Sequence, residues 1–407
     1  MSKKKILQIN TVSNSRSTGR IAEGIGYAIK NEGWESWMAS GKRMSARSNS
    51  AHQYFIGSSL DYYLHALGSR FFDAQGFFSK SSTKKLISKI EEIQPDLIHL
   101  HNIHGYYLNM EILFRYLQQA NIPVVWTLHD CWPYTGHCAY YTAINCKKWE
   151  THCESCPNIK SYPQSYIDRS FRNFNVKREL FTAVKRLSIV TPSNWLANEV
   201  KRSFLKNFPI HVINNGINLS AFKPAHHRSI LEKYSLVGKR IILGVASVWD
   251  ERKGLNDFLK LDPLLEGEQF QIVLVGLSAK QITELPKTIV GISRTEDIAE
   301  LAALYSEASF FFNPTYEDNF PTTNIEALAC GTPVITYDTG GSPEIIDEKT
   351  GFVVRKGDVG EVASLIKAFS NSKESSSELM RKRALQHFDQ EHKFKEYINL
   401  YKTLLQE

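Results

Sequence analysis

Short runs of strand character alternate with helix-like patterns along the whole chain, and this alternation constrains the fold more than any other feature. The runs are rich in β-branched and aromatic residues, and each half of the chain contains five of them. They are Lys5–Ile9, Ser36–Ala39, Leu97–Leu100, Val124–Leu128 and Ser188–Thr191 in the first half, and His211–Asn214, Ile241–Ala246, Gln271–Val275, Ser309–Phe312 and Pro333–Thr336 in the second. Alternation of this kind favours a parallel sheet in each half. The sequence therefore predicts an α/β protein.

The length of the chain predicts two domains. A chain of 407 residues normally divides into two units, each with its own core. We expect an N-terminal domain over 1–205, a C-terminal domain over 206–385 and a final amphipathic helix over 386–407. Ligands of such sheets bind beyond the carboxyl ends of the strands, so we look there for functional residues.

The segment from Thr315 to Gly331 has the composition of a binding site. It follows an apolar strand, and Pro321 fits the first position of a helix that Gly331 would close in the left-handed region. Backbone N–H groups near Pro321, Thr322 and Thr323 would favour an anion such as a diphosphate. Asn319 and Phe320 precede them as further donor-binding candidates. Glu326 can accept from ribose hydroxyls, and Asp318 and Glu317 can accept from a sugar. The plainer interpretation is a strand-loop-helix unit whose acids only stabilise the helix start.

This segment resembles the acid-x7-acid signature of retaining glycosyltransferases of family four (group 1), which have the GT-B fold. Counting back from Glu326, the first acid falls on Asp318, and Glu317 lies one place outside, so we assign the catalytic acid role to both. The following run from Gly331 to Ile346 continues the resemblance. The resemblance implies two Rossmann-like domains facing across a cleft, with the C-terminal helix crossing back to the first domain.

The same resemblance implies an activity. The protein would transfer a sugar from a nucleoside diphosphate sugar to a glycan or lipid-linked saccharide, with retention at the anomeric carbon, in cell-surface polysaccharide biosynthesis such as that of capsule or lipopolysaccharide. The resemblance also implies that catalysis requires no cofactor and no metal, and the absence of an Asp-x-Asp motif fits this. The alternatives are a nucleotide-sugar epimerase of the same fold and a non-catalytic module that binds sugar nucleotides or glycans.

Two cations are candidates for holding the diphosphate. Lys253 precedes Gly254 after the strand Ile241–Ala246, and it matches the second cation of the family's Arg-x4-Lys pair. The Arg position of that pair falls on Val248, so Arg252 is the expected substitute. A solvated pair of loop charges would look the same.

Polar residues also follow the strands of the first half. The resemblance places His129, after the strand Val124–Leu128, near the anomeric carbon of the donor. His101 and His104 form a second cluster that could receive the acceptor. Gly19 corresponds to the family's glycine-rich first loop, although the usual pair of glycines is reduced to one.

Positive charge is concentrated in the first half. Residues 1–200 contain 24 Lys and Arg against 15 Asp and Glu. The densest stretch runs from Tyr62 to Lys89 and interleaves aromatic residues with Lys80, Lys84 and Lys85, as surfaces that bind anionic membranes do. Nucleic acid would attract the same charge, and a solvated helix face has the same pattern. We expect a cytoplasmic protein, peripheral at the inner face of the cell membrane, that binds no nucleic acid.

Five of the six cysteines fall in an expected insertion at about 131–160, and the sixth is Cys330. Cys138, Cys146, Cys153 and Cys156 could form a structural zinc site. Their spacing lacks a second close pair, and reduced, partly buried thiols are the alternative.

Overall fold

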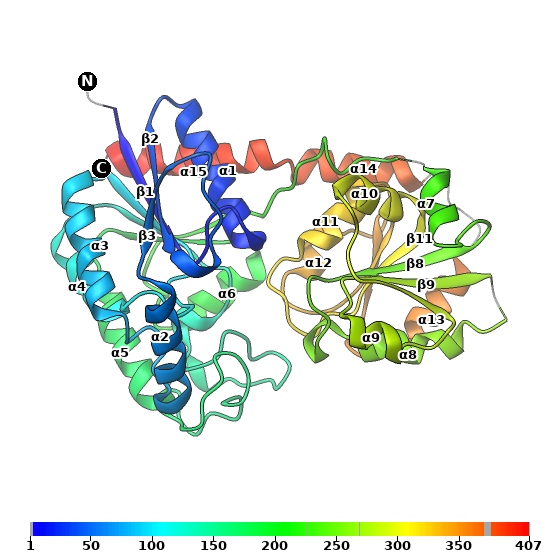
Figure 1. The fold of residues 1–407 in the computed structure, drawn as a ribbon, viewed down its shortest axis with the longest axis horizontal. Helices are drawn as coiled ribbons and strands as arrows, with labels where there is room; N and C mark the ends of the chain where they lie inside the picture. Colours follow the sequence, from blue (N-terminus) through cyan, green and yellow to red (C-terminus); the bar gives the residue numbers. More distant parts are fainter. Residues whose placement is uncertain (1–2, 226, 268, 370–375, 407) are drawn as a thin grey trace. The chain divides into compact units, whose positions relative to one another are not determined.

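The chain folds into two compact units in the computed structural model, which describes residues 3–225, 227–267, 269–369 and 376–406. One unit comprises Met1–Asn214 together with Lys393–Glu407, and the other comprises Asn215–His392 (Figure 1). Each unit is a parallel sheet covered by helices, so the predicted α/β class is confirmed.

The first unit contains a seven-stranded sheet in the order β3-β2-β1-β4-β5-β6-β7, and all of its neighbouring strands are parallel. The strands are β1 (Lys5–Asn10), β2 (Glu35–Gly41), β3 (His52–Ile56), β4 (Leu97–Leu100), β5 (Val124–Thr127), β6 (Leu187–Thr191) and β7 (Ile210–Val212). The helices are α1 (Arg16–Asn31), α2 (Ser59–Phe72), α3 (Lys80–Ile93), α4 (Met110–Gln119), α5 (Ser170–Thr182), α6 (Asn194–Arg202) and α15 (Gln390–Gln406), with short 3-10 turns η1 (Lys42–Met44), η2 (Trp132–Tyr134) and η3 (Lys148–Glu150).

The second unit repeats this order, as β10-β9-β8-β11-β12-β13. Its strands are β8 (Arg240–Val245), β9 (Phe270–Val275), β10 (Ile289–Ile292), β11 (Ala308–Asn313), β12 (Val334–Tyr337) and β13 (Gly351–Val354). Its helices are α7 (Arg228–Lys233), α8 (Leu255–Leu264), α9 (Ala279–Glu284), α10 (Ile298–Glu307), α11 (Thr322–Ala329), α12 (Ser342–Ile345), α13 (Val359–Ala368) and α14 (Ser376–His387), with the 3-10 turn η4 (Glu251–Lys253). In both sheets the first strand of the unit lies in the middle, where a doubly wound sheet changes direction and binds ligands.

The last helix belongs to the first unit. Phe394, Tyr397 and Tyr401 of α15 are buried in one cluster with Ile25 of α1 and Leu97 of β4. The contact is close, since a Cβ built on Gly24 would lie 2.1 Å from a ring atom of Phe394. The expected return of the C-terminal helix to the first domain is therefore confirmed.

One predicted strand lies in a different unit from the one expected. The run at His211–Asn214 was predicted for the second domain, but Ile210–Val212 pairs with β6 at the edge of the first sheet. The chain therefore divides after Asn214. The prediction also missed β3, β10 and β13, which are short edge or near-edge strands with several half-exposed residues.

Candidate functional site

The acidic segment of the second unit connects the carboxyl end of β11 to helix α11. The helix begins at Thr322, one residue later than predicted, because Pro321 has an extended backbone with ψ of 115° and precedes the first turn. Gly331 follows the helix with φ of +84°, as predicted. Glu326 lies one turn into the helix, half-buried, and its Oε2 accepts a hydrogen bond from the Tyr305 hydroxyl at 3.0 Å. Sequence analysis missed Tyr305, which carries no motif of its own.

A glycine turn holds the loop before α11. Gly340 has φ of +56°, and a Cβ built on it would lie 1.7 Å from the carbonyl oxygen of Asp318. The N–H of Gly341 donates to the carbonyl of Asn319 at 3.1 Å. The backbone of the acidic loop is therefore pressed against this turn, which only glycine allows.

Lys253 and Asp318 form an ion pair in this site. Lys253 Nζ lies 2.5 Å from Asp318 Oδ2, and each side chain is 19% exposed. Burial alone would raise the pKa of Asp318, but Lys253 and the N–H of Phe320 keep that pKa below its usual value. The pair comes together because Gly254, with φ of +74°, brings η4 against the end of β11. The approach is so close that a Cβ added to Gly254 would lie 2.3 Å from the Pro314 carbonyl oxygen.

The guanidinium of Arg252 contacts the same loop. Its Nη1 donates to the carbonyl of Glu317 at 2.9 Å, and the Arg252 carbonyl accepts from the N–H of Tyr316 at 2.8 Å. The two predicted cations and both predicted acids therefore meet at the carboxyl ends of β8 and β11. Glu317 is itself 8% exposed, whereas the Asp318 carboxylate faces Lys253.

In the first unit, His101 and His129 are adjacent. His101 follows β4 and His129 follows β5, so parallel pairing brings them to one sheet edge, where their ring nitrogens His101 Nδ1 and His129 Nε2 lie 3.1 Å apart. The ring of His99 is tilted against that of His101 at a centroid distance of 4.0 Å, and His99 Nδ1 lies 2.6 Å from the Tyr401 hydroxyl of α15. Burial lowers the pKa of His129 to about 4, so its ring is neutral at pH 7.

The hydrogen bonds of Gln8 assign the protons on both rings. Gln8 Nε2 donates to the Ala22 carbonyl at 2.9 Å, which fixes the amide because a carbonyl can only accept. Gln8 Oε1 then accepts from His101 Nε2 at 3.1 Å. Burial holds the pKa of His101 well below its usual value, so the His101 ring is neutral and its Nδ1 can only accept. His129 Nε2 must therefore carry the proton, which makes Nδ1 the acceptor of the His129 ring.

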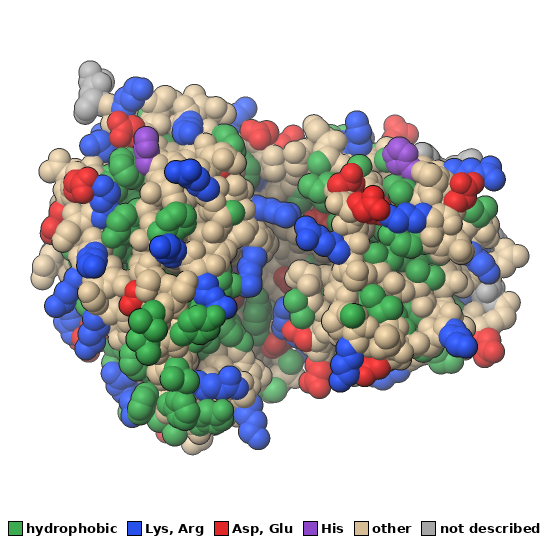
Figure 2. Space-filling model, viewed as in Figure 1, with side chains coloured by type: hydrophobic (Ala, Val, Ile, Leu, Met, Phe, Trp, Pro, Cys, Tyr) green, Lys and Arg blue, Asp and Glu red, His purple; other side chains and the backbone are tan. Residues whose placement is uncertain are grey.

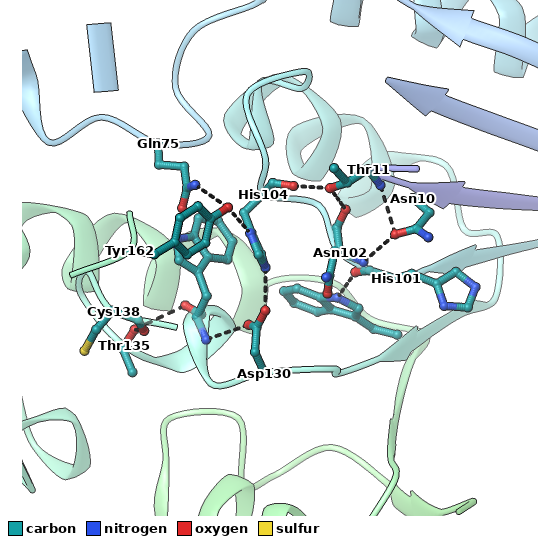
Figure 3. A network of polar contacts seen from close by, with 12 residues as sticks. Asn10, Thr11, Gln75, His101, Asn102, His104, Asp130, Thr135, Cys138 and Tyr162 are labelled. Atoms are coloured by element: carbon teal, nitrogen blue, oxygen red, sulfur yellow. Dashed lines mark hydrogen bonds and ion pairs between the residues drawn. The ribbon is translucent and has the colours of Figure 1, made fainter. Parts of the chain in front are cut away.

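His104 is held in a separate network (Figure 3). Its Nε2 lies 2.7 Å from Asp130 Oδ2, and its Nδ1 lies 3.0 Å from the hydroxyl of Tyr162, which also accepts from Gln75. The pKa of Asp130 lies below its usual value because His104 and the N–H of Trp132 offset the effect of burial. The network joins the loop after β4 to the segment after β5, and His104 is 6% exposed.

Gly19 lies elsewhere than predicted. Helix α1 begins at Arg16, so Gly19 is in its first turns and not in the loop after β1. A Cβ at Gly19 would lie 3.3 Å from the backbone nitrogen of Asn14, so the glycine lets that loop pack against the helix. A contact of Gly19 with phosphate or acceptor stays a prediction.

The cysteine-rich insertion is well packed. Trp149 packs against Tyr134 and Tyr141 with ring distances of 5.1 and 5.0 Å, and all three rings are buried, so the insertion has a core of its own. Lys177 is buried beneath it and donates to the carbonyls of Trp132 and Thr135.

The four predicted zinc ligands, Cys138, Cys146, Cys153 and Cys156, line one small open pocket. Within the described ranges, however, no three His, Cys, Asp or Glu side chains are arranged to hold a metal ion. The cysteines are free thiols. A zinc site there stays a prediction.

Comparisons with known proteins agree with the fold. "Glycosyltransferase Family 4" matches residues 45–221 and "Glycosyl transferases group 1" matches residues 239–371. WcaC of Escherichia coli K12, named as a colanic acid biosynthesis glycosyl transferase, is 26% identical over 327 residues, 76% of this chain and 77% of its own. The capsular polysaccharide biosynthesis glycosyltransferase CapM of Staphylococcus aureus is 22% identical over 210 residues, 48% of this chain and 54% of its own.

Solved structures share the whole architecture. Sucrose-phosphate synthase of Thermosynechococcus elongatus superposes with a TM-score of 0.74 at 18% identity, covering 99% of both chains. Anabaena HepE in complex with UDP-glucose superposes with a TM-score of 0.65 at 15% identity, covering 98% of this chain and 99% of its own. With a family model matching in each half of the chain, the chain belongs to the group 1, family four glycosyltransferases of the GT-B fold.

Proposed function

We propose that the protein transfers a hexose from a nucleoside diphosphate sugar to a glycan or lipid-linked saccharide, with retention at the anomeric carbon, in the synthesis of a cell-surface polysaccharide. The observation that carries this proposal is the ion pair of Lys253 with Asp318 in the loop before α11, with Glu326 one turn into the same helix. A cation, two acids and a helix start are the groups that a sugar nucleotide requires.

The donor would bind across this site. The N–H groups at the start of α11 and the ammonium of Lys253 stabilise the diphosphate as it gains charge on leaving. Glu326, oriented by Tyr305, accepts from the ribose hydroxyls. Asp318 and Glu317 accept from the hydroxyls of the sugar. When no donor substrate is bound, Lys253 is paired with Asp318. Binding of the diphosphate would therefore exchange one anionic partner of Lys253 for another.

The first unit would bind the acceptor. His129, after β5, is the residue that the resemblance assigns to the sugar. We favour attack on the same face from which the diphosphate leaves, with a diphosphate oxygen taking the proton of the acceptor hydroxyl. That route gives retention and needs no protein nucleophile.

The names of similar proteins support this choice. HepE was solved with UDP-glucose, and WcaC and CapM are named for colanic acid and capsular polysaccharide biosynthesis. These names favour a uridine diphosphate hexose as the first donor to test.

The proposal is tested by a donor screen followed by a transfer assay. A donor at a hundred times its dissociation constant should stabilise the protein by about 2.7 kcal/mol, which thermal denaturation detects. The stabilising donor is then supplied with an acceptor extract, and proton NMR reads the anomeric configuration of the product. A product of inverted configuration contradicts retention. Turnover of the donor to its epimer indicates an epimerase, and binding without turnover indicates a binding module.

A further inference from the structure

Helix α2 exposes its apolar side. Its buried residues are the small or polar His65, Gly68 and Ser69. Its exposed residues include a stripe of large apolar side chains: Leu60 (66% exposed), Tyr63 (55%), Leu64 (57%), Leu67 (55%) and Phe71 (50%). Their spacing of three or four residues places them on one side of the helix. A surface helix normally turns such a stripe toward the core, so the arrangement here is inverted.

The packing beneath α2 fixes this orientation. A Cβ built on Gly68 would lie 2.4 Å from a ring carbon of Phe78, so this side of the helix accepts no larger residue without rearrangement. His65 Nε2 accepts from the N–H of Gly76 at 3.1 Å, and its Nδ1 lies 2.8 Å from the Ser79 hydroxyl. These contacts hold the small, polar side of α2 against residues 76–79 and leave the stripe in solvent.

The apolar surface continues beyond the helix. Phe71 contacts Tyr166 at a ring distance of 5.4 Å, and Tyr166 is 64% exposed. Phe72 and Phe171 are also about half-exposed. Figure 2 shows hydrophobic side chains gathered over the region of α2. The patch is larger than the scattered apolar residues of an ordinary surface, and such patches mark interaction sites.

Arginines border this surface. Arg43 lies over the ring of Tyr63 at 4.2 Å, Arg70 over Tyr166 at 5.4 Å and Arg169 over Phe72 at 5.8 Å. Stacking on the aromatic rings keeps each guanidinium beside the apolar stripe. The nearest acid on the helix, Asp61, accepts from the N–H and hydroxyl of Ser58 at the helix start.

The positive charge around the stripe indicates which kind of partner binds there. A symmetric contact with a second copy would bring one set of arginines against its equivalent, which opposes association. An anionic bilayer complements both features at once, because its headgroups attract the arginines while its acyl boundary accepts the leucines and aromatic rings.

We propose that the α2 surface, defined as Leu60, Tyr63, Leu64, Leu67, Phe71 and Tyr166 with Arg43, Arg70 and Arg169, binds the surface of an anionic membrane. This deepens the proposed function, because an enzyme docked in this way meets a lipid-linked acceptor. It also moves the expected contact away from the lysines of α3. Lys89 pairs with Glu92 and lies over Trp37, and none of the large exposed apolar side chains among the described residues comes from α3.

The test is co-sedimentation of the full chain with vesicles of phosphatidylcholine and phosphatidylglycerol in a two-to-one ratio. The double variant Leu64→Glu/Leu67→Glu should lose about tenfold or more in vesicle binding, since two side chains that enter the membrane become charged. Arg43→Gln/Arg169→Gln should weaken binding in low salt and have a smaller effect in high salt. Because all four side chains are on the surface, the melting temperature without vesicles should stay within a few degrees of the parent.

Two matched controls keep the proposal falsifiable. Val237→Glu/Leu385→Glu changes two apolar residues of the second unit that are 50% and 51% exposed, and vesicle binding should be retained. Lys84→Gln/Lys85→Gln should reduce binding less than the arginine variant does. An equal loss of vesicle binding in either control overturns the α2 assignment. Failure of the unsubstituted protein to bind vesicles overturns it as well.

A parent that forms dimers without vesicles, and becomes monomeric in the Leu64→Glu/Leu67→Glu variant, would instead assign the surface to a second copy. None of these measurements uses a donor or turnover. Failure of sugar transfer and failure of membrane binding are therefore distinguishable.

Discussion

The two acids before α11 differ in their surroundings. Asp318 pairs with Lys253, while the carbonyl of Glu317 is held by Arg252. We expect Asp318→Asn to lower kcat/KM by about tenfold to a hundredfold, because one charge-assisted hydrogen bond contributes about 1.5–3 kcal/mol. Glu317→Gln should have a smaller effect. Steady-state kinetics with the donor measures both, and a larger loss in Glu317→Gln would assign the sugar contact to that residue.

Gln8 is a positioning residue for His129, since its amide determines which nitrogen of His101 accepts. Nitrogen-15 NMR of histidine-labelled protein should show the Nε2 proton on both rings. In Gln8→Leu the Nδ1 proton should become populated on His129, and turnover should fall. The conservative Gln8→Asn is the control for packing. A parent with the Nδ1 proton on His129 contradicts the assignment.

At the level of elements, the glycine turn supports the acidic loop. Gly340→Ala should both destabilise the second unit and weaken donor binding, because its Cβ would overlap the Asp318 carbonyl. Gly238→Ala is a matched control, since its φ is +75° and nothing lies within 4 Å of an added Cβ. In this control the free energy of unfolding should decrease by only about 1–2 kcal/mol, because alanine is strained in the left-handed region. Equal donor affinity in the two variants, measured by calorimetry, would show that the turn does not position the loop.

The central elements of both sheets could be predicted, because buried parallel strands such as Leu97–Leu100 form continuous apolar runs. Strand β7 was placed in the wrong unit because the sequence of a three-residue edge strand does not indicate which strand it pairs with. Lys253 and Asp318 were both predicted as site residues, but their pairing depends on the turn at Gly254, which sequence spacing does not give. The outward stripe of α2 was missed because its periodicity is that of a helix facing a core.

For the molecule as a whole, buried neutral histidines predict acid sensitivity of the first unit. Burial lowers the pKa of His65 to about 3 and of His129 to about 4, and it holds those of His99 and His101 well below the usual value. The unfolded chain takes up protons near pH 6.5 and the native state does not, so stability is complete above that pH and falls as the pH decreases.

The urea concentration at the midpoint of unfolding should therefore decrease as the pH is lowered from 7 to 5. Most carboxylates titrate below this range. His65→Gln should make the midpoint less dependent on pH, whatever the substitution does to stability at pH 7. Hydrogen exchange should locate the loss in β4 and β5. A midpoint independent of pH over this range would mean that the histidines are not buried in the neutral form.

The central claim is that the start of α11 and Lys253 hold a nucleoside diphosphate. Isothermal titration of UDP, ADP and GDP into the full chain tests it most directly. We expect one site for one of these nucleotides, weakened by about tenfold or more in Lys253→Gln and in Glu326→Gln. Lys280→Gln, a surface lysine 83% exposed in the same unit, should bind as the parent does. Binding of all three nucleotides that is unaffected by Lys253→Gln and Glu326→Gln would contradict the account.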